Sequence, residues 1–168
     1  MNEDRFWELI ENAWAPLGPE AGEARRVLTA RSPDTDVFAM PEHSVVEKAL
    51  DEVTDNLGAL VRDLTAEELT GLDRVLERLL HDLDRADVHA VTHGSDDGFL
   101  YVRGAIVALG RDFYTAVSAD PRLAVPGARS ESMPYLFAHL HRERFGAFPA
   151  TGSGVSRESF CNPTGWRT

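Results

Sequence analysis

Residues 65–83, TAEELTGLDRVLERLLHDL, carry the strongest amphipathic pattern in the chain and decide the fold class. Their apolar side chains recur every three or four residues, which places them on one side of a helix; they are Leu69, Leu72, Val75, Leu76, Leu79, Leu80 and Leu83. Thr65 and Glu68 have the spacing of a capping box at the start of such a helix. A leucine stripe of this kind is typical of a helix in a core, although it also suits a dimer seam.

The same helical period recurs on both sides of this stretch. Helices are expected over about 4–14, 20–30, 44–64, 85–91, 95–110, 111–119 and 132–145, with loops over 31–42 and 122–130. Ser44 with Glu47 gives a second capping-box pattern, and Ser132 with Pro134 is expected to start the last helix. No stretch shows the period-two alternation of strands joined by hairpin turns. The sequence therefore predicts an all-α fold, a single compact domain of about six or seven helices.

The end of the chain has a different composition. From residue 150 it reads ATGSGVSRESFCNPTGWRT, which is rich in glycine, serine, threonine and proline. Such a segment has few apolar side chains to bury, and chain termini of this kind are commonly mobile. We expect a helical domain over residues 1–146 and a flexible tail over residues 147–168.

The charge of the chain argues against polyanionic partners. The net charge is −11 at pH 7, and its distribution is uneven. Residues 1–84 hold 20 acidic and 8 basic side chains, a net charge of −12, whereas residues 85–168 hold 8 acidic and 9 basic, a net charge of +1. Nucleic acids bind chiefly to clustered cations, which the acidic first half repels. We expect no nucleic acid and no membrane among the partners.

The sequence also indicates a location. No apolar run approaches the roughly 20 residues that span a bilayer. Residues 1–14, MNEDRFWELIENAW, are charged and interrupted, unlike a signal peptide. Cys161 is the single cysteine, so an internal disulfide cannot form. A reducing cytoplasmic location is expected.

The stretch Ser95-Asp96-Asp97-Gly98-Phe99, here called the SDDGF turn, is the main candidate site. A structural interpretation is sufficient: Ser95 caps the helix that follows, and the two aspartates favour the positive end of its dipole. Two neighbouring carboxylates could alternatively perform general acid-base chemistry if burial separated their pKa values. Asp96, Asp97 and Arg103 are the candidate catalytic residues on that alternative.

A metal site is a third possibility at the same place. His89 and His93 are four residues apart, so one helix face could present both imidazoles, with a carboxylate of the SDDGF turn beside them. The pattern is incomplete, because zinc-protease helices carry a glutamate next to the first histidine and Ala90 stands there. The chain has no phosphate-binding loop, dinucleotide fingerprint or nucleophile elbow, and no cofactor is expected.

The SDDGF turn also carries a resemblance to a known family. The turn, then Tyr101, Arg103-Gly104, Gly110-Arg111 and Ala119-Asp120-Pro121, with the opening run Phe6–Ile10, resembles the bacterial domain of unknown function 4240 over roughly residues 3–124. The family pattern has a tryptophan-rich stretch where His81–Arg85 stand and often a cysteine where Gly94 stands, so this chain is a divergent member on that comparison. The resemblance implies a helical bacterial domain and draws attention to Asp96, Asp97 and Arg103.

Two functions follow from these patterns. The first is a non-catalytic interaction or regulatory module that binds another protein. The alternative is an uncharacterised enzyme or metal-binding protein with its site around the SDDGF turn. A pocket that holds Asp96, Asp97 and Arg103 would favour the enzyme, whereas their use in helix caps and internal bonds would favour the module.

Overall fold

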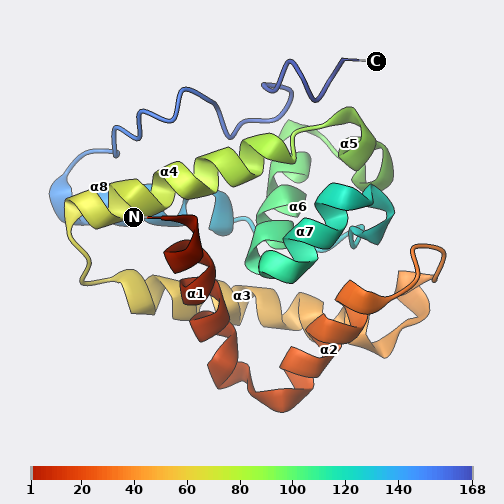
Figure 1. Ribbon diagram of the computed structural model, residues 1–168. Helices are drawn as coiled ribbons and strands as arrows, with labels where there is room; N and C mark the ends of the chain where they lie inside the picture. The colour runs from red at the N-terminus through yellow and green to blue at the C-terminus, as the bar shows by residue number, and fades with distance from the viewer. Residues whose placement is uncertain (1, 168) are drawn as a thin grey trace.

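The computed structural model describes residues 2–167, and over this range the chain forms α-helices joined by short connections (Figure 1). The helices are α1 (Glu3–Trp14), α2 (Gly18–Ala30), α3 (Pro41–Val61), α4 (Ala66–Asp82), α5 (Ala86–Thr92), α6 (Asp96–Ala108), α7 (Arg111–Ala119) and α8 (Leu136–Phe145). The connections contain the 3₁₀ turns η1 (Ala15–Leu17), η2 (Val37–Ala39), η3 (Pro121–Leu123) and η4 (Met133–Tyr135). Residues 2–167 contain no strand, and the predicted all-α fold is confirmed.

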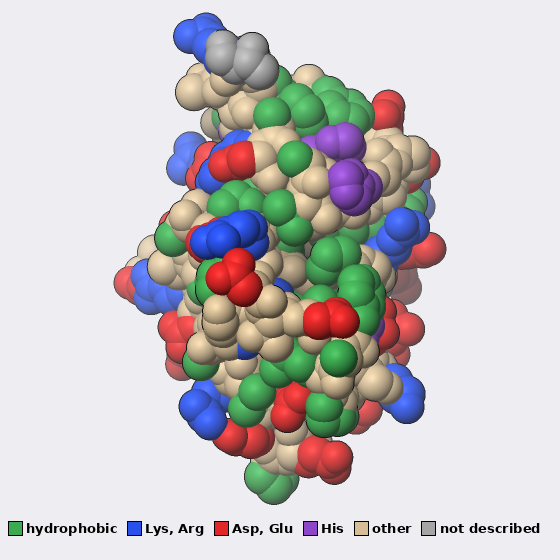
Figure 2. Space-filling view, turned by 90° about the vertical axis from the view of Figure 1, so that its right-hand side faces the viewer, with side chains coloured by type: hydrophobic (Ala, Val, Ile, Leu, Met, Phe, Trp, Pro, Cys, Tyr) green, Lys and Arg blue, Asp and Glu red, His purple; other side chains and the backbone are tan. Residues whose placement is uncertain are grey.

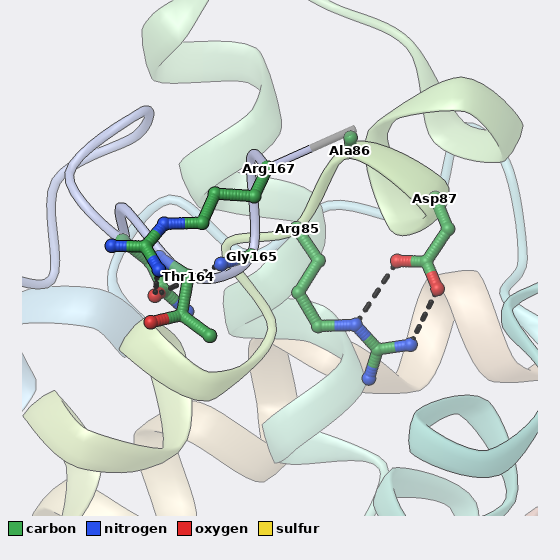
Figure 3. Close-up of a pocket in the computed structure, with 7 residues that line it drawn as sticks. Arg85, Ala86, Asp87, Thr164, Gly165 and Arg167 are labelled. Atoms are coloured by element: carbon green, nitrogen blue, oxygen red, sulfur yellow. Dashed lines mark hydrogen bonds and ion pairs between the residues drawn. The ribbon is translucent and has the colours of Figure 1, made fainter.

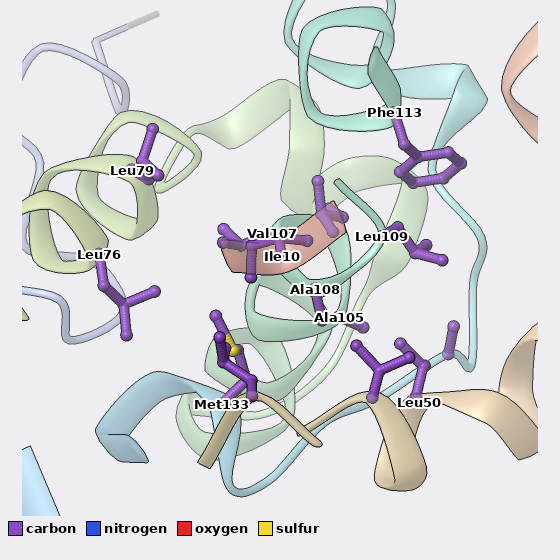
Figure 4. Packing of buried hydrophobic residues seen from close by; sticks show 14 of the residues in the cluster. Ile10, Leu50, Leu76, Leu79, Ala105, Val107, Ala108, Leu109, Phe113 and Met133 are labelled. Atoms are coloured by element: carbon purple, nitrogen blue, oxygen red, sulfur yellow. The ribbon is translucent and has the colours of Figure 1, made fainter. Parts of the chain in front are cut away.

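Helix α6 is the centre of the core. Ten of its 13 residues are buried, and α3, α4, α5 and α7 all pack against it. A helix that is apolar on all sides is typical of a fully surrounded position. Figure 4 shows Ile10 of α1, Leu50 of α3 and Leu76 of α4 around the side chains of α6. The N-terminal end of α6 is the SDDGF turn, so the packing of this helix fixes where the turn lies.

Helix α4 confirms the pattern that decides the fold class. Its capping box is complete: the Glu68 amide donates to the Thr65 hydroxyl at 3.2 Å, and the Thr65 amide donates to the Glu68 carboxylate at 2.9 Å. The leucines of its apolar side are buried within this single chain; they are Leu69, Leu72, Leu76, Leu79 and Leu80. The stripe is therefore core in this chain, packed against α6 and α8, and no second copy is needed to cover it.

Two helices do not begin at the serine caps that the sequence predicts. In each case a proline occupies the first helical turn instead. Helix α3 begins at Pro41, and Ser44 lies one turn inside it. Proline suits a first helical position, since its fixed φ is helical and its missing amide has no partner there anyway. Before α8 the chain first makes the 3₁₀ turn η4 with Pro134, and the Ser132 side chain makes no capping bond.

The C-terminal segment, residues 147–167, has no helix or strand and runs along the outside of α4 (Figure 1). The sequence predicts little burial in this segment. The fully buried apolar cluster is built from residues between Phe6 and Phe137, and Trp166 of the segment is partly buried against it. The polar side chains of the segment differ from that expectation, because Arg157, Ser159 and Asn162 are buried against the helices. No sequence pattern indicates these contacts, and the mobility of the segment stays a prediction.

Candidate functional site

The SDDGF turn is built as a helix cap. The Ser95 hydroxyl accepts a hydrogen bond from the Gly98 amide at 3.4 Å and so occupies the N-cap position of α6. Asp96 and Asp97 stand in the first turn with exposed side chains. Carboxylates at this end of a helix are favoured by its dipole, which is the structural role that the sequence predicts. The two aspartates face solvent and do not line a cavity with Arg103.

Arg103 lies in the interior and is fully buried. Its guanidinium donates to the Leu80 carbonyl at 2.7 Å and to the Ser159 hydroxyl at 2.8 Å, and it lies 4.7 Å from the centre of the Phe99 ring. Burial lowers the pKa of Arg103 to about 10, against the opposing attraction of the Asp84 carboxylate. Arg103 is therefore still a cation at neutral pH, and two of its donors serve the protein itself.

Steric crowding explains why the residue after Arg103 is a glycine. A Cβ atom on Gly104 would lie 2.9 Å from Cδ of Pro134 and 3.0 Å from the Ser130 carbonyl oxygen. Both contacts are shorter than side chains normally make, so only glycine lets the backbone of α6 approach η4 this closely. The arginine-glycine pair of the family resemblance thus combines a buried cation with a close backbone approach.

Among the described residues, His89 and His93 are not joined by a third side chain that could complete a metal site. Within residues 2–167 no group of three or more histidine, cysteine, aspartate or glutamate side chains is placed to hold a metal ion. Nε2 of His89 contacts the Gly94 carbonyl at 3.1 Å, and its ring packs among the rings of Phe99, Phe160 and Trp166 at 5.0–5.5 Å between centroids. His93 is exposed and ends α5 with a positive φ of 56°.

A second set of charged residues lies on the other side of α4, facing the C-terminal segment. Asp73, Glu77, His81 and Asp84 follow one another at spacings of four, four and three residues, which is one face of a helix and its C-terminal end. We call these four residues, together with Arg103 of α6, the α4 groove. Each of them contacts the C-terminal segment.

The first contact is a buried ion pair. Arg157 donates to both carboxylate oxygens of Asp73, at 2.9 and 2.7 Å, and the two side chains are only 8% and 2% exposed. The same guanidinium donates to the Pro134 carbonyl at 2.6 Å. One turn further along α4, Glu77 accepts hydrogen bonds from the hydroxyls of Ser153 and Thr151, at 2.5 and 2.6 Å.

The second contact is a carboxylate enclosed by backbone amides. Asp84 is fully buried and accepts from three consecutive amides, those of Phe160, Cys161 and Asn162, at 2.7–2.9 Å. The indole of Trp166 donates to the same carboxylate at 3.0 Å. Four donors satisfy a buried carboxylate that would otherwise be costly. Phe160 has a positive φ of 65°, part of the turn that aims these amides at one point.

A hollow of about 400 Å³ lies beside this contact and is bounded in part by the C-terminal segment (Figure 3). Its lining comprises Arg85, Ala86, Asp87, Asn162, Thr164, Gly165 and Arg167. Arg85 is not free to bind a ligand there, because it makes two hydrogen bonds to Asp87, at 3.0 and 2.6 Å, and one to the Ser118 carbonyl. Neither the SDDGF turn nor Arg103 contributes to the lining.

The surface of the molecule is mixed in character. Figure 2 shows histidine side chains beside hydrophobic ones on one face of the molecule, with acidic and basic side chains interspersed below them. Two large apolar side chains of the C-terminal segment are about half exposed, Phe148 at 53% and Phe160 at 45%. The segment therefore turns polar groups toward α4 and leaves Phe148 and Phe160 about half exposed, while Phe160 and Trp166 also pack against the rings of His89 and Phe99. Within residues 2–167 no helix is both long and apolar enough to cross a membrane.

The groove escaped sequence reasoning for a physical reason. Polar residues at helical spacing on one side of an amphipathic helix are normally its solvated face. Asp73 and its partner Arg157 are 84 residues apart, so neither position alone indicates a buried pair. The only local signal is that Asp73 lies four residues after Leu69 and three before Leu76, at the edge of the apolar stripe.

Comparison with known proteins gives one match. The family model described as "Protein of unknown function (DUF4240)" matches residues 36–138, which include the SDDGF turn, Arg103 and the acidic residues of the α4 groove, but not the C-terminal segment. No curated protein and no solved structure matches the chain. The match covers more than half of the chain and agrees with the resemblance found at the SDDGF turn. The chain belongs to the DUF4240 family.

Proposed function

We propose that this protein is a non-catalytic interaction or regulatory module whose partner is another protein. The observation that carries the proposal is the separation of Asp96 and Asp97 from Arg103. The two carboxylates stand in solvent at a helix end, whereas the guanidinium is buried and bonded to Leu80 and Ser159. A catalytic constellation needs its groups within reach of one reacting atom. These three residues instead contribute to capping and internal packing.

The proposed partner class follows from charge and surface. A chain of net charge −11 repels polyanions, which disfavours nucleic acid. Half-exposed aromatic rings such as Phe148 and Phe160 are the kind of side chain that protein interfaces use. A cytoplasmic location suits a chain with the single cysteine Cys161.

A thermal-shift screen separates this proposal from an enzyme or metal-binding protein at the SDDGF turn. The purified protein is melted alone and with divalent metal ions, nucleotides, phosphate and small carboxylic acids. We expect none of them to raise the melting temperature. Asp96→Asn and Asp97→Asn should each melt slightly below the parent, because each loses about 0.3–1 kcal/mol of interaction with the helix dipole.

Asp112→Asn is the matched control, since Asp112 is likewise exposed in the first turn of its helix, α7. Its melting temperature should fall by a similar amount. The proposal is wrong if a compound stabilises the parent and the Asp112 variant but neither the Asp96 nor the Asp97 variant. It is also wrong if both SDDGF variants melt above the parent, because removing a strained functional charge raises stability.

A further inference from the structure

We propose that the α4 groove is a binding site for an extended segment of a partner protein that carries an arginine followed two residues later by a serine. In this chain, on this proposal, residues 151–166 of the C-terminal segment occupy that site in cis. The inference rests on the proposed function as an interaction module and adds where the partner binds and with what chemistry. It comes from the contacts between Asp73, Asp84 and Arg103 on one side and the C-terminal segment on the other.

The groove has the chemistry of a peptide site. An extended chain offers backbone amide hydrogens and regularly spaced side chains. The α4 groove has hydrogen-bonding partners for both. The Asp84 carboxylate accepts hydrogen bonds from three successive backbone amides, and these bonds do not depend on which side chains the residues carry. Asp73 takes the guanidinium of Arg157 through two parallel hydrogen bonds, a geometry that distinguishes arginine from lysine. Arg103 meets the hydroxyl of Ser159.

These contacts define what a ligand must supply. The site recognises the side chains of the arginine and of the serine two positions later, because both side chains are buried in it. The residue between them, Glu158, is exposed, and its carboxylate accepts a hydrogen bond from the Tyr135 hydroxyl. The Ser159 hydroxyl also donates to the Asp96 carbonyl at 2.6 Å, which leaves little room for a bulkier residue. The three residues that follow the serine contribute their backbone amides.

The segment in cis is held in a way that permits its release. The fully buried apolar cluster lies between Phe6 and Phe137, so detaching residues 147–167 removes from the core only the packing of Trp166, which is partly buried against it. Gly146, which ends α8, has a left-handed φ of 80°, and residues 147, 148 and 150 after it are exposed. Release uncovers the charged groups of Asp73, Asp84 and Arg103, which can then be hydrated. It also uncovers the ring of Phe99, on which Phe160 and Trp166 pack, so opening costs some apolar contact as well.

The C-terminal segment already occupies the α4 groove, and this determines how a partner can bind there. A tethered segment acts at a high effective concentration, so a partner segment must out-compete it or meet the groove when the segment has been drawn away. The groove residues Asp73, Asp84 and Arg103 lie inside residues 36–138, the part that the family model describes, and the segment lies beyond it. On this proposal, the site lies within the part of the chain that the family model matches, and residues 151–166 control access to it.

The test uses the full chain and a fluorescent peptide of residues 150–167, with binding followed by anisotropy. Arg157→Ala in the protein removes the anchor of the cis segment and leaves the groove itself intact. We expect this variant to bind the peptide about 10- to 100-fold more tightly than the parent does, since competition in cis is weakened. Adding Asp73→Asn to that variant should abolish the gain, because the peptide arginine loses its partner.

Three controls make the result decisive. Arg26→Ala changes an exposed arginine of α2 that pairs only with Glu23 of the same helix, and it should leave peptide affinity at the parent value. A peptide with alanine in place of Arg157 should bind weakly to every variant. Arg157→Ala/Ser159→Ala removes a second anchor, so that one residual contact cannot keep the groove closed.

The proposal is overturned if both anchor variants are helical by circular dichroism and yet bind the peptide no better than the parent. It is also overturned if the variants instead form dimers in light scattering, because the occupant would then be a second copy. Either failure leaves the thermal-shift screen unaffected. A protein that binds no small molecule and no peptide would still be an interaction module, with its partner surface elsewhere.

Discussion

The two sides of α4 are both buried, but by different means. One side packs leucines such as Leu72 and Leu76 against α6 and α8. The other side presents Asp73, Glu77 and Asp84 to a segment that arrives from the end of the chain. Apolar burial is non-directional and tolerates small adjustments, whereas a buried carboxylate needs donors at fixed positions. The leucine side stabilises the fold, whereas the polar side determines which segment can bind against it.

Substitutions on the two sides of α4 should also differ in how much of the molecule they destabilise. A buried leucine contributes to one cooperative core, so its loss weakens the whole molecule. A buried ion pair contributes little net stability, yet removing one partner leaves a charge that must find water. If the C-terminal segment can move away, as proposed above, damage on the polar side should remain local. The predictions below test that difference.

The largest effect is expected on the apolar side. Leu76→Ala removes a fully buried side chain of α4 and should cost about 2–5 kcal/mol of unfolding free energy. Urea unfolding followed by circular dichroism measures this. Leu60→Ala on α3 is the matched control, because Leu60 is 46% exposed and its loss should change stability by less than about 0.5 kcal/mol. Equal losses in the two variants would show that the core is not organised as described.

On the polar side, Arg157→Ala should destabilise less than Leu76→Ala. Breaking a buried pair costs about 3–5 kcal/mol when the remaining charge cannot be hydrated. Here release of the C-terminal segment exposes Asp73 to water, so the cost is limited to the free energy with which the segment is held. Limited proteolysis should cleave the segment faster in this variant than in the parent and leave the helical domain whole. Cleavage at the same rate in both proteins would mean that Arg157 does not hold the segment.

The close approach of α6 to η4 gives an intermediate effect. Gly104→Ala places a methyl group against Pro134 and Ser130 and should cost about 1–3 kcal/mol through overpacking. Gly22→Ala in α2 is the control of opposite sign, because a Cβ there meets nothing within 4 Å and alanine favours helix by about 0.5–1 kcal/mol. Thermal melts of the two variants should shift in opposite directions. A stabilising Gly104 substitution would contradict the packing described.

The smallest effect concerns pH and the polar side alone. Burial raises the pKa of Glu77, but hydrogen bonds from Ser153 and Thr151 and the charge of Arg157 outweigh it, and the net shift is downward from 4.5. A lowered pKa means that Glu77 contributes stability above pH 4.5 and loses it as the pH falls through the lowered value. Protection of the segment should therefore decline below pH 4.5. Glu77→Gln should remove part of that decline; an unchanged acid profile would exclude Glu77 as its source.

The fold could be predicted from the sequence because its signals are local. Helix α4 follows from leucine spacing and a capping box within its own residues, and the cap at Ser95 is likewise local. Helix starts at Pro41 and η4 were less predictable, since serine and proline compete for the same positions. The family resemblance at the SDDGF turn was confirmed by the match over residues 36–138.

The candidate site could not be predicted to the same extent. Arg103 attracted attention through the family resemblance, but its partners Leu80 and Ser159 lie 23 and 56 residues away. Asp84 looked like one more acid on a solvated helix, and its donors are backbone amides, which every residue type except proline carries. Hydrophobic periodicity detects burial by apolar side chains. It gives no signal for a segment that is held through hydrogen bonds to distant charges.

Native-state hydrogen exchange at the amides of Phe160, Cys161 and Asn162 tests the central claim most directly. These amides donate to Asp84, and their exchange can be compared with that of core amides in α6, such as Val107, in the parent and in Arg157→Ala. We predict protection of all three in the parent and its selective loss in the variant, with α6 unchanged. Free exchange in the parent, or equal loss of protection in the segment and in α6, would contradict the account.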